Sequence, residues 1–394
     1  MTTVTIGAGE DYATWAAFHT ALASPLTDDL TVLVDGGTYN EEMTWAKDNA
    51  AHTVLVQNAD TSAVIFDAQS TRAYAMHLTV GFIEVFGNFE FKNATTADIC
   101  TDGTGANGTI RFRGAVKCIN GVVGAQLYSE NTIYFEGVEL RDQTSAGTEV
   151  YGSSTWPRYF IGCRGRTTTN ITPFSCFAGG SFLADGSRGG FYGCTYRSEV
   201  GAGYGADSGF FGGAIYCYRC RSFGSIGMSF RQSWEGTPSY FQECYVDGMW
   251  RAYWGFALMG ARGNVVLKRC TVRNVTSRGI YSSLTTPSVL AVTNCGIDTA
   301  NIGVINTTTG TIVLTNVGTY NLAGVRTSGA GITDTNPVTG NPVLRTLAAL
   351  DGDALPAVGG AWDKTGTADG LIVLRPGDNP DIGCVMIVPP SLRD

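Results

Sequence analysis

The chain has 394 residues with a formal net charge of −8 at pH 7, and it is rich in glycine and cysteine, with 52 and 11 residues. This length exceeds the usual size of one globular core, so the chain either divides into domains or grows by repetition. The acidic balance and the absence of a lysine and arginine cluster argue against nucleic acid and against an anionic membrane as partners. Neither an 18-residue apolar run nor a secretory signal pattern occurs, so we expect folding in a cytosol.

The cysteines fit a packing role better than a metal role. In a reducing compartment thiols stay free, and a free cysteine behaves as a small buried hydrophobic residue. Cys217 and Cys220 form one C-x2-C pair without a second pair at zinc spacing. We therefore expect no metal and no cofactor.

The first predicted element is a helix in the stretch DYATWAAFHTAL. Trp15, Phe18 and Leu22 recur there at i, i+3 and i+7, which is typical of an amphipathic helix. Such a helix can cover the open end of a sheet. Residues 1–29 are accordingly predicted to be an N-terminal strand and a capping helix.

A repeat follows, with a period of about 25 residues. Each unit has an apolar residue, two mostly polar residues, an anchor residue and often a further apolar residue two positions on. The anchors are Phe89, Val138, Cys163, Cys194, Cys220, Cys244, Cys270, Cys295 and Val317, with room for one more unit around Val116 and Cys118. Apolar alternation at period two predicts strands, and repetition at this period predicts a solenoid.

The residue before each anchor indicates a tight corner. These residues are Asn88, Gly137, Gly162, Gly193, Arg219, Glu243, Arg269, Asn294 and Asn316. Most are glycine or asparagine, the types that tolerate a left-handed backbone. A glycine and an apolar residue often follow about eight residues after the anchor, as in Gly279-Ile280 and Gly303-Val304, and we interpret them as a second corner before the next strand.

Short strands joined by tight corners predict an all-β, single-stranded, right-handed parallel β-helix solenoid of about 12 coils. Equivalent side chains then stack about 4.8 Å apart. We expect a buried column of free thiols at Cys163, Cys194, Cys220, Cys244, Cys270 and Cys295. The β-helix is predicted to span residues 30–326, and an irregular closing segment residues 327–394.

The stretch VVLKRCTVRNVTSRGIYSS, residues 265–283, resembles the coil repeat of the right-handed parallel β-helix, or pectin-lyase-like, superfamily. TVLVDGGTYNEEMTW, residues 31–45, resembles the first rung of pectin-methylesterase-like chains, and DNPDIGCVMIV, residues 378–388, resembles a closing strand. The resemblance covers roughly residues 30 to 385. It implies a fold more than a function, because this superfamily includes lyases, hydrolases, esterases, phage tailspikes and virion parts.

The catalytic motifs of that superfamily are missing. The sequence lacks the paired aspartates and Gly-His-Gly of polygalacturonases, the Arg-x-Pro-x-x-Arg of pectate lyases and the later pectin methylesterase motifs. The three histidines, His19, His52 and His77, fit surface or packing roles better than a catalytic triad. Asp98 and Asp102, near the glycine-rich TDGTGANGT, could belong to a calcium loop, but a plain turn is the favoured interpretation.

One candidate surface lies in the aromatic stretch between residues 150 and 260. Its residues are Arg231, Trp234, Glu235, Asp247, Trp250, Arg251 and Trp254. Carboxylates beside aromatic rings suit glycoside hydrolysis, with Glu235 and Asp247 as the candidate acids. Aromatic and arginine residues are also enriched at subunit interfaces, and we favour this contact role over a catalytic cleft.

Three functions remain open. The leading hypothesis is a structural or attachment protein of a bacteriophage particle, a decoration protein or short spike, because a rugged fold without an export signal suits a virion assembled in host cytoplasm. We expect a homotrimer in contact with other virion proteins. The alternatives are a tailspike-type polysaccharide lyase or hydrolase, and a noncatalytic glycan-binding β-helix, with host surface polysaccharide as the ligand.

Overall fold

The computed structural model describes most of the chain. The described residues are 1–50, 52–102, 108–128, 131–150, 158–167, 172–176, 189–198, 208–212, 216–224, 226–230, 239–249, 252–260, 264–339, 362–366 and 372–376. The chain divides into two compact units, the first made of residues 1–181 and 188–190 and the second of residues 182–187 and 191–394. In the described part, no helix is long and apolar enough to span a membrane.

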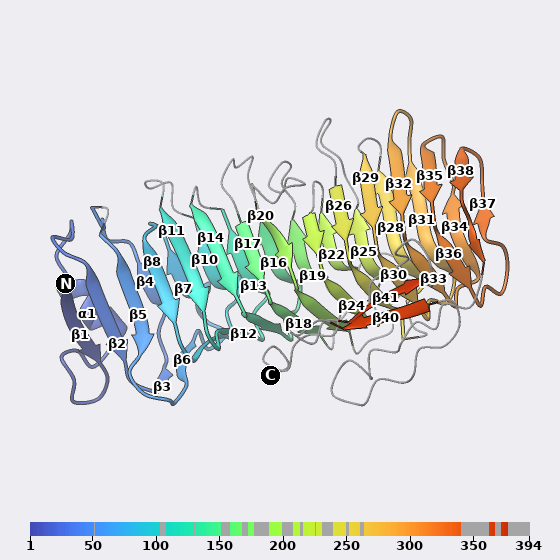
Figure 1. Ribbon diagram of the computed structural model, residues 1–394. Helices are drawn as coiled ribbons and strands as arrows, with labels where there is room; N and C mark the ends of the chain where they lie inside the picture. The colour runs from blue at the N-terminus through green and yellow to red at the C-terminus, as the bar shows by residue number, and fades with distance from the viewer. Residues whose placement is uncertain are drawn as a thin grey trace. The chain divides into compact units, whose positions relative to one another are not determined.

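Both units are parallel β-solenoids in which each coil contributes one strand to each of three sheets (Figure 1). In the first unit, sheet 1 contains β1 (Thr2–Ile6), β2 (Leu30–Val34), β5 (Val54–Asn58), β8 (Ile83–Phe86), β11 (Thr109–Arg113), β14 (Thr132–Glu136) and β17 (Arg158–Ile161). Sheet 2 contains β3 (Gly37–Tyr39), β6 (Val64–Asp67), β9 (Phe89–Lys92), β12 (Lys117–Ile119), β15 (Glu139–Arg141) and β18 (Arg164–Thr167). Sheet 3 contains β4 (Met43–Trp45), β7 (Tyr74–Leu78), β10 (Ala97–Thr101), β13 (Val123–Leu127), β16 (Ala146–Val150) and β19 (Thr172–Cys176).

The second unit repeats this arrangement. Its sheet 1 contains the end of β20 (Gly189–Tyr192), then β23 (Tyr216–Tyr218), β26 (Ser239–Gln242), β29 (Val265–Lys268), β32 (Val289–Thr293), β35 (Thr311–Thr315) and β38 (Ile332–Thr335). Sheet 2 contains β21 (Thr195–Ser198), β24 (Arg221–Phe223), β27 (Tyr245–Asp247), β30 (Thr271–Arg273), β33 (Gly296–Asp298), β36 (Gly318–Tyr320) and β39 (Val338–Thr339). Sheet 3 contains β22 (Ser208–Gly212), β25 (Ile226–Phe230), β28 (Trp254–Gly260), β31 (Arg278–Leu284), β34 (Ile302–Asn306) and β37 (Thr327–Ser328).

These sheets confirm the predicted fold class, an all-β parallel β-solenoid with the architecture that the resemblance implied. β38 and β39 still pair in parallel with β35 and β36. β40 (Trp362–Gly366) and β41 (Ile372–Pro376) instead form an antiparallel hairpin. The domain boundaries at residues 29 and 326 stay a prediction.

The helix α1 (Trp15–Ala21) covers the first coil, as predicted (Figure 1). Its buried Trp15 ring lies 6.3 Å from the ring of Trp45 and 6.1 Å from that of Phe66, both of which fill the coil interior. The Glu41 carboxylate accepts the backbone N–H groups of Trp15 and Ala16 at 2.8 and 3.0 Å. These N–H groups have no partner inside a helix, so Glu41 fixes the helix start to the coil below.

The corner before each anchor is confirmed. Eight of the nine predicted corner residues have φ between +53° and +74°, namely Gly137, Gly162, Gly193, Arg219, Glu243, Arg269, Asn294 and Asn316. The exception is Asn88, where the preceding Gly87 takes the positive φ of 122°. A left-handed residue turns the chain sharply, so the side chains of the next strand point inward again.

The predicted second corner is displaced. Gly279 and Gly303 lie inside strands β31 and β34, and the left-handed residues after sheet 2 are instead Asn274 and Thr299. A Cβ on Gly279 would come within 2.4 Å of Ile297 Cγ2. Glycine is needed at position 279 because the backbone packs closely against the Ile297 side chain, and not because the position requires a left-handed φ.

Candidate functional site

Three outward side chains stand side by side on sheet 3 of the first unit. The register pairs Thr44 of β4 with His77 of β7, and His77 with Cys100 of β10. The neighbouring positions point inward, and Met43, Met76 and Ile99 are fully buried. The period of two therefore separates an apolar interior from a polar outer column.

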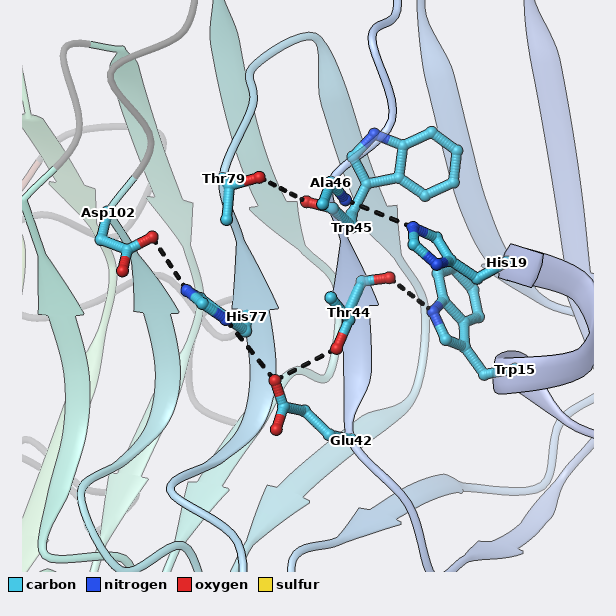
Figure 2. Close-up of polar contacts among 9 residues, drawn as sticks. All are labelled: Trp15, His19, Glu42, Thr44, Trp45, Ala46, His77, Thr79 and Asp102. Atoms are coloured by element: carbon cyan, nitrogen blue, oxygen red, sulfur yellow. Dashed lines mark hydrogen bonds and ion pairs between the residues drawn. The ribbon is translucent and has the colours of Figure 1, made fainter. Parts of the chain in front are cut away.

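His77 lies between two carboxylates (Figure 2). Its Nε2 is 2.8 Å from Asp102 Oδ1, and its Nδ1 is 3.5 Å from Glu42 Oε1. Glu42 precedes β4 and also accepts the Thr44 hydroxyl at 3.1 Å, while Asp102 follows β10. We call Glu42, His77, Cys100 and Asp102, with the neighbouring Tyr74, the His77 cluster.

The charges around His77 favour its imidazolium form. The hydrogen bond with Glu42 raises the pKa of His77 above its ordinary value, burial opposes that shift, and the bond and charge of Asp102 add to it. The protonated ring donates to both carboxylates. The cluster is open to solvent, with side-chain exposures of 22% for His77, 25% for Glu42 and 40% for Asp102.

Tyr74 and Cys100 complete the cluster on its buried side. The Tyr74 ring lies 4.7 Å from the His77 ring, and the two side chains of Tyr74 and Cys100 are hydrogen-bonded. Burial raises the pKa of Tyr74 to about 12. Burial, with the charge of Asp102, also raises the pKa of the Cys100 thiol to about 12. Both groups therefore stay protonated near neutral pH when no other ligand is present.

The sequence did not single out this cluster. His77 was expected to be a surface or packing residue, and Asp98 and Asp102 were considered for a calcium loop. The structure separates the two aspartates: Asp102 contacts His77, whereas Asp98 is fully buried and accepts the backbone N–H groups of Ala94 and Gly121 at 3.2 Å each. Residues 103–107 of that loop lie outside the described residues.

The other histidines have different surroundings. His19 Nε2 accepts the backbone N–H of Ala46 at 3.3 Å beside the Trp45 ring, which ties α1 to the strand below (Figure 2). His52 lies 3.5 Å from the exposed Asp29. Packing and surface roles therefore describe these two residues well.

The structure describes two of the seven residues of the predicted contact surface, Asp247 and Trp254. Asp247 is 6% exposed and accepts hydrogen bonds from Met249 N, Asn274 Nδ2 and Tyr245 OH, so its carboxylate holds a corner. Trp254 is 3% exposed and stacks on Tyr281 with the ring centroids 4.6 Å apart. The remaining five, Arg231, Trp234, Glu235, Trp250 and Arg251, lie outside the described residues. The contact surface stays a prediction.

The six ladder cysteines are all buried and free. In the second unit, Cys220, Cys244, Cys270 and Cys295 each donate from Sγ to a carbonyl oxygen of the preceding coil, at 3.1–3.7 Å. Cys163 makes the same contact in the first unit, with Phe135 O at 3.3 Å. Equivalent anchors in other coils are buried valines, such as Val138 and Val317. The position is therefore a packing position that also satisfies a weak donor.

No protein-family model and no curated protein matches the chain. Several solved structures are similar to it at low sequence identity. The catalytic domain of a GH87 alpha-1,3-glucanase in complex with tetrasaccharides has a TM-score of 0.48 and 12% identity over 78% of this chain and 64% of that chain, so this chain spans less than two thirds of that domain. The pectate lyase Pel9A has a TM-score of 0.46 and 13% identity over 97% of this chain and 96% of its own. A rhamnogalacturonan lyase has a TM-score of 0.43 and 12% identity over 91% of this chain and 95% of its own. Likenesses of this size do not identify a reaction.

Proposed function

We propose that the chain is an enzyme that cleaves a polysaccharide at the His77 cluster. The observation that carries the proposal is the outward imidazole of His77 held between the carboxylates of Glu42 and Asp102. Cleavage of a glycosidic bond needs a proton donor and a base or nucleophile close to that bond. His77 and Asp102 offer these two groups on an open part of the surface.

The roles follow from exposure and contacts. Asp102 is the most exposed of the three side chains and is placed to meet substrate, whereas Glu42 is held by Thr44 and orients the imidazole. A second carboxylate that fixes a histidine ring is a recurring arrangement in acid–base sites. The outer face of a solenoid repeats along its axis, which suits an extended polymeric ligand.

The test uses Asp102→Asn and His77→Gln, with His52→Gln as the control, because His52 lies outside the cluster. Each protein is incubated with a panel of neutral and acidic polysaccharides, and new reducing ends and unsaturated products are measured. We expect both cluster variants to lose at least about 100-fold in kcat/KM, in line with loss of an acid–base group. Unchanged cleavage by both variants would show that the His77 cluster is not the active site. Absence of cleavage by the native chain would contradict the proposed function itself.

The virion hypothesis stays a prediction. It rests on the sequence alone, as do the homotrimer, the other virion proteins as partners and the host cytoplasm as the place of assembly. Imaging of the protein in its native particle tests all of them together.

A further inference from the structure

Three atoms of different chemistry converge in the His77 cluster. A ring nitrogen of His77, the sulfur of Cys100 and a carboxylate oxygen of Asp102 all lie within 4.8 Å of one another. His77 and Cys100 are brought together by the parallel register of β7 and β10, and Asp102 lies two residues after Cys100. Two adjacent coils thus supply one nitrogen, one sulfur and one oxygen donor.

This donor set favours zinc. Imidazole and thiolate ligands select transition metals such as Zn²⁺, whereas Ca²⁺ and Mg²⁺ prefer oxygen ligands only. Tetrahedral Zn²⁺ with ordinary bond lengths holds its ligand atoms about 3.3–3.7 Å apart. To bind the ion, His77 Nε2 and Asp102 Oδ1, which are 2.8 Å apart, would move apart by about half an ångström. The Cys100 sulfur would move closer to these two atoms by up to about one ångström. Asp102 is 40% exposed, so its side chain is not enclosed on all sides by packing.

The groups behind these donors already have the arrangement of a metal site. A metal-bound histidine usually donates its other ring N–H to a carboxylate, and Glu42 lies 3.5 Å from His77 Nδ1. The Tyr74 hydroxyl is hydrogen-bonded to the Cys100 sulfur, where it can stabilise a thiolate ligand. Glu42 and Tyr74 are not donors to the ion themselves, and the Glu42 contact at Nδ1 leaves Nε2 as the nitrogen that faces it.

We propose that His77, Cys100 and Asp102 bind one Zn²⁺ ion, with Glu42 and Tyr74 as outer partners and a fourth position open for water or substrate. Three protein ligands with an open position are typical of catalytic rather than structural zinc. This inference rests on the proposed function only in placing the chemistry at this cluster. With Zn²⁺ bound, His77 and Asp102 are ligands and are no longer the acid–base pair, so the zinc-bound and zinc-free clusters are distinct states of the same site.

Metal binding is measured directly on the full-length chain. The protein is stripped with a chelator and titrated with Zn²⁺ in competition with a colorimetric indicator, and bound metal is counted by elemental analysis. We expect one Zn²⁺ per chain. Cys100→Ser, His77→Gln and Asp102→Asn should each weaken binding by at least about 100-fold, and Tyr74→Phe by about tenfold. Cys270→Val, which changes a ladder cysteine, is the control and should bind Zn²⁺ normally.

Cobalt provides a second readout that identifies the sulfur. Co²⁺ in the same site should give a thiolate-to-metal charge-transfer band in the near ultraviolet, present in the native chain and in Cys270→Val but absent in Cys100→Ser. A chain that binds no stoichiometric Zn²⁺, or a band that survives in Cys100→Ser, would overturn the zinc site. A chain that binds one Zn²⁺ but cleaves no polysaccharide, with or without the metal, would overturn the proposed function and leave the zinc site intact.

Discussion

Cys270 donates from its Sγ to the carbonyl oxygen of Phe241, 29 residues earlier, at 3.1 Å. This contact crosses from one coil to the preceding one and recurs at Cys220, Cys244 and Cys295. The position is fully enclosed, with Cys270 only 1% exposed. Two properties can therefore be separated by mutation there: apolar volume and the weak thiol hydrogen bond.

We expect Cys270→Val to lower the free energy of unfolding by less than about 1.5 kcal/mol, because the volumes are similar and valine already occupies Val138 and Val317. Cys270→Ser should cost about 1–3 kcal/mol, because the shorter C–O bond leaves the hydroxyl too far from Phe241 O for a good hydrogen bond. Urea unfolding of both variants measures the difference. A larger loss for valine than for serine would show that the column is not an apolar packing position.

Buried thiols should also be slow to react. Burial, the largest cause, raises the pKa of Cys244, Cys270 and Cys295 well above its ordinary value, so little thiolate forms near neutral pH. Nine of the eleven cysteines are free and buried. A coloured disulfide reagent should therefore label at most two of the eleven thiols in the native protein and all eleven in denaturant. Rapid native labelling of several thiols would contradict the ladder.

The ladder and the corners were predictable because they depend on local chemistry that the repeat displays. A left-handed corner selects glycine or asparagine at one position, and a narrow interior selects small apolar side chains at the next. The predicted second corner failed: Gly279 lies within β31, where glycine is needed because a Cβ would collide with Ile297.

The His77 cluster was not predictable in this way. His77 and Cys100 are 23 residues apart in the sequence. Glu42 and Asp102 lie outside the strands, before β4 and after β10, and so do not occupy the repeat position that His77 and Cys100 share. Their contact depends on the strand register of the early coils, where the sequence repeat is least regular. The outward positions of β4, β7 and β10 carry three different residue types, Thr44, His77 and Cys100, so no repeat marks this column in the sequence. Only the folded register of β4, β7 and β10 brings these side chains together.

Glu243 provides a test of the corner stack. Its carboxylate lies 2.8 Å from Arg219 Nε and 3.3 Å from Arg269 Nη2, the corner residues of the coils on either side. The Glu243 side chain is 7% exposed, whereas the two arginines are 33% and 30% exposed.

Glu243→Ala should therefore lower the free energy of unfolding by about 1–3 kcal/mol, less than for a fully buried pair because solvent screens the arginines. Arg269→Ala should cost less, because Arg219 remains as a partner. Urea unfolding at low and high salt separates the charge effect from lost packing, since only the charge effect shrinks with salt. An equal cost at both ionic strengths would show that charge pairing is not what Glu243 contributes.

The contact between α1 and the first coil should weaken in acid because of His19. Burial, the largest cause, and the positive charge of Lys47 lower the pKa of His19 below its ordinary value of 6.5. The neutral ring is the form that accepts the Ala46 N–H. A group whose pKa is lower in the folded state binds fewer protons there than in the unfolded state. The stability that it contributes is thus complete above pH 6.5 and is lost as the pH falls below 6.5 toward the folded value.

The NMR signals of the indole N–H groups of Trp15 and Trp45, whose rings lie 6.3 Å apart at this contact, can follow local unfolding in urea from pH 8 to pH 5. We expect the midpoint to fall with pH in the native chain and to be flatter in His19→Gln, whose amide oxygen can still accept the Ala46 N–H without titrating. Lys47→Met should also flatten the profile, because removal of the positive charge brings the folded pKa of His19 closer to 6.5. A His19→Gln profile as steep as that of the native chain would assign the acid sensitivity to another group.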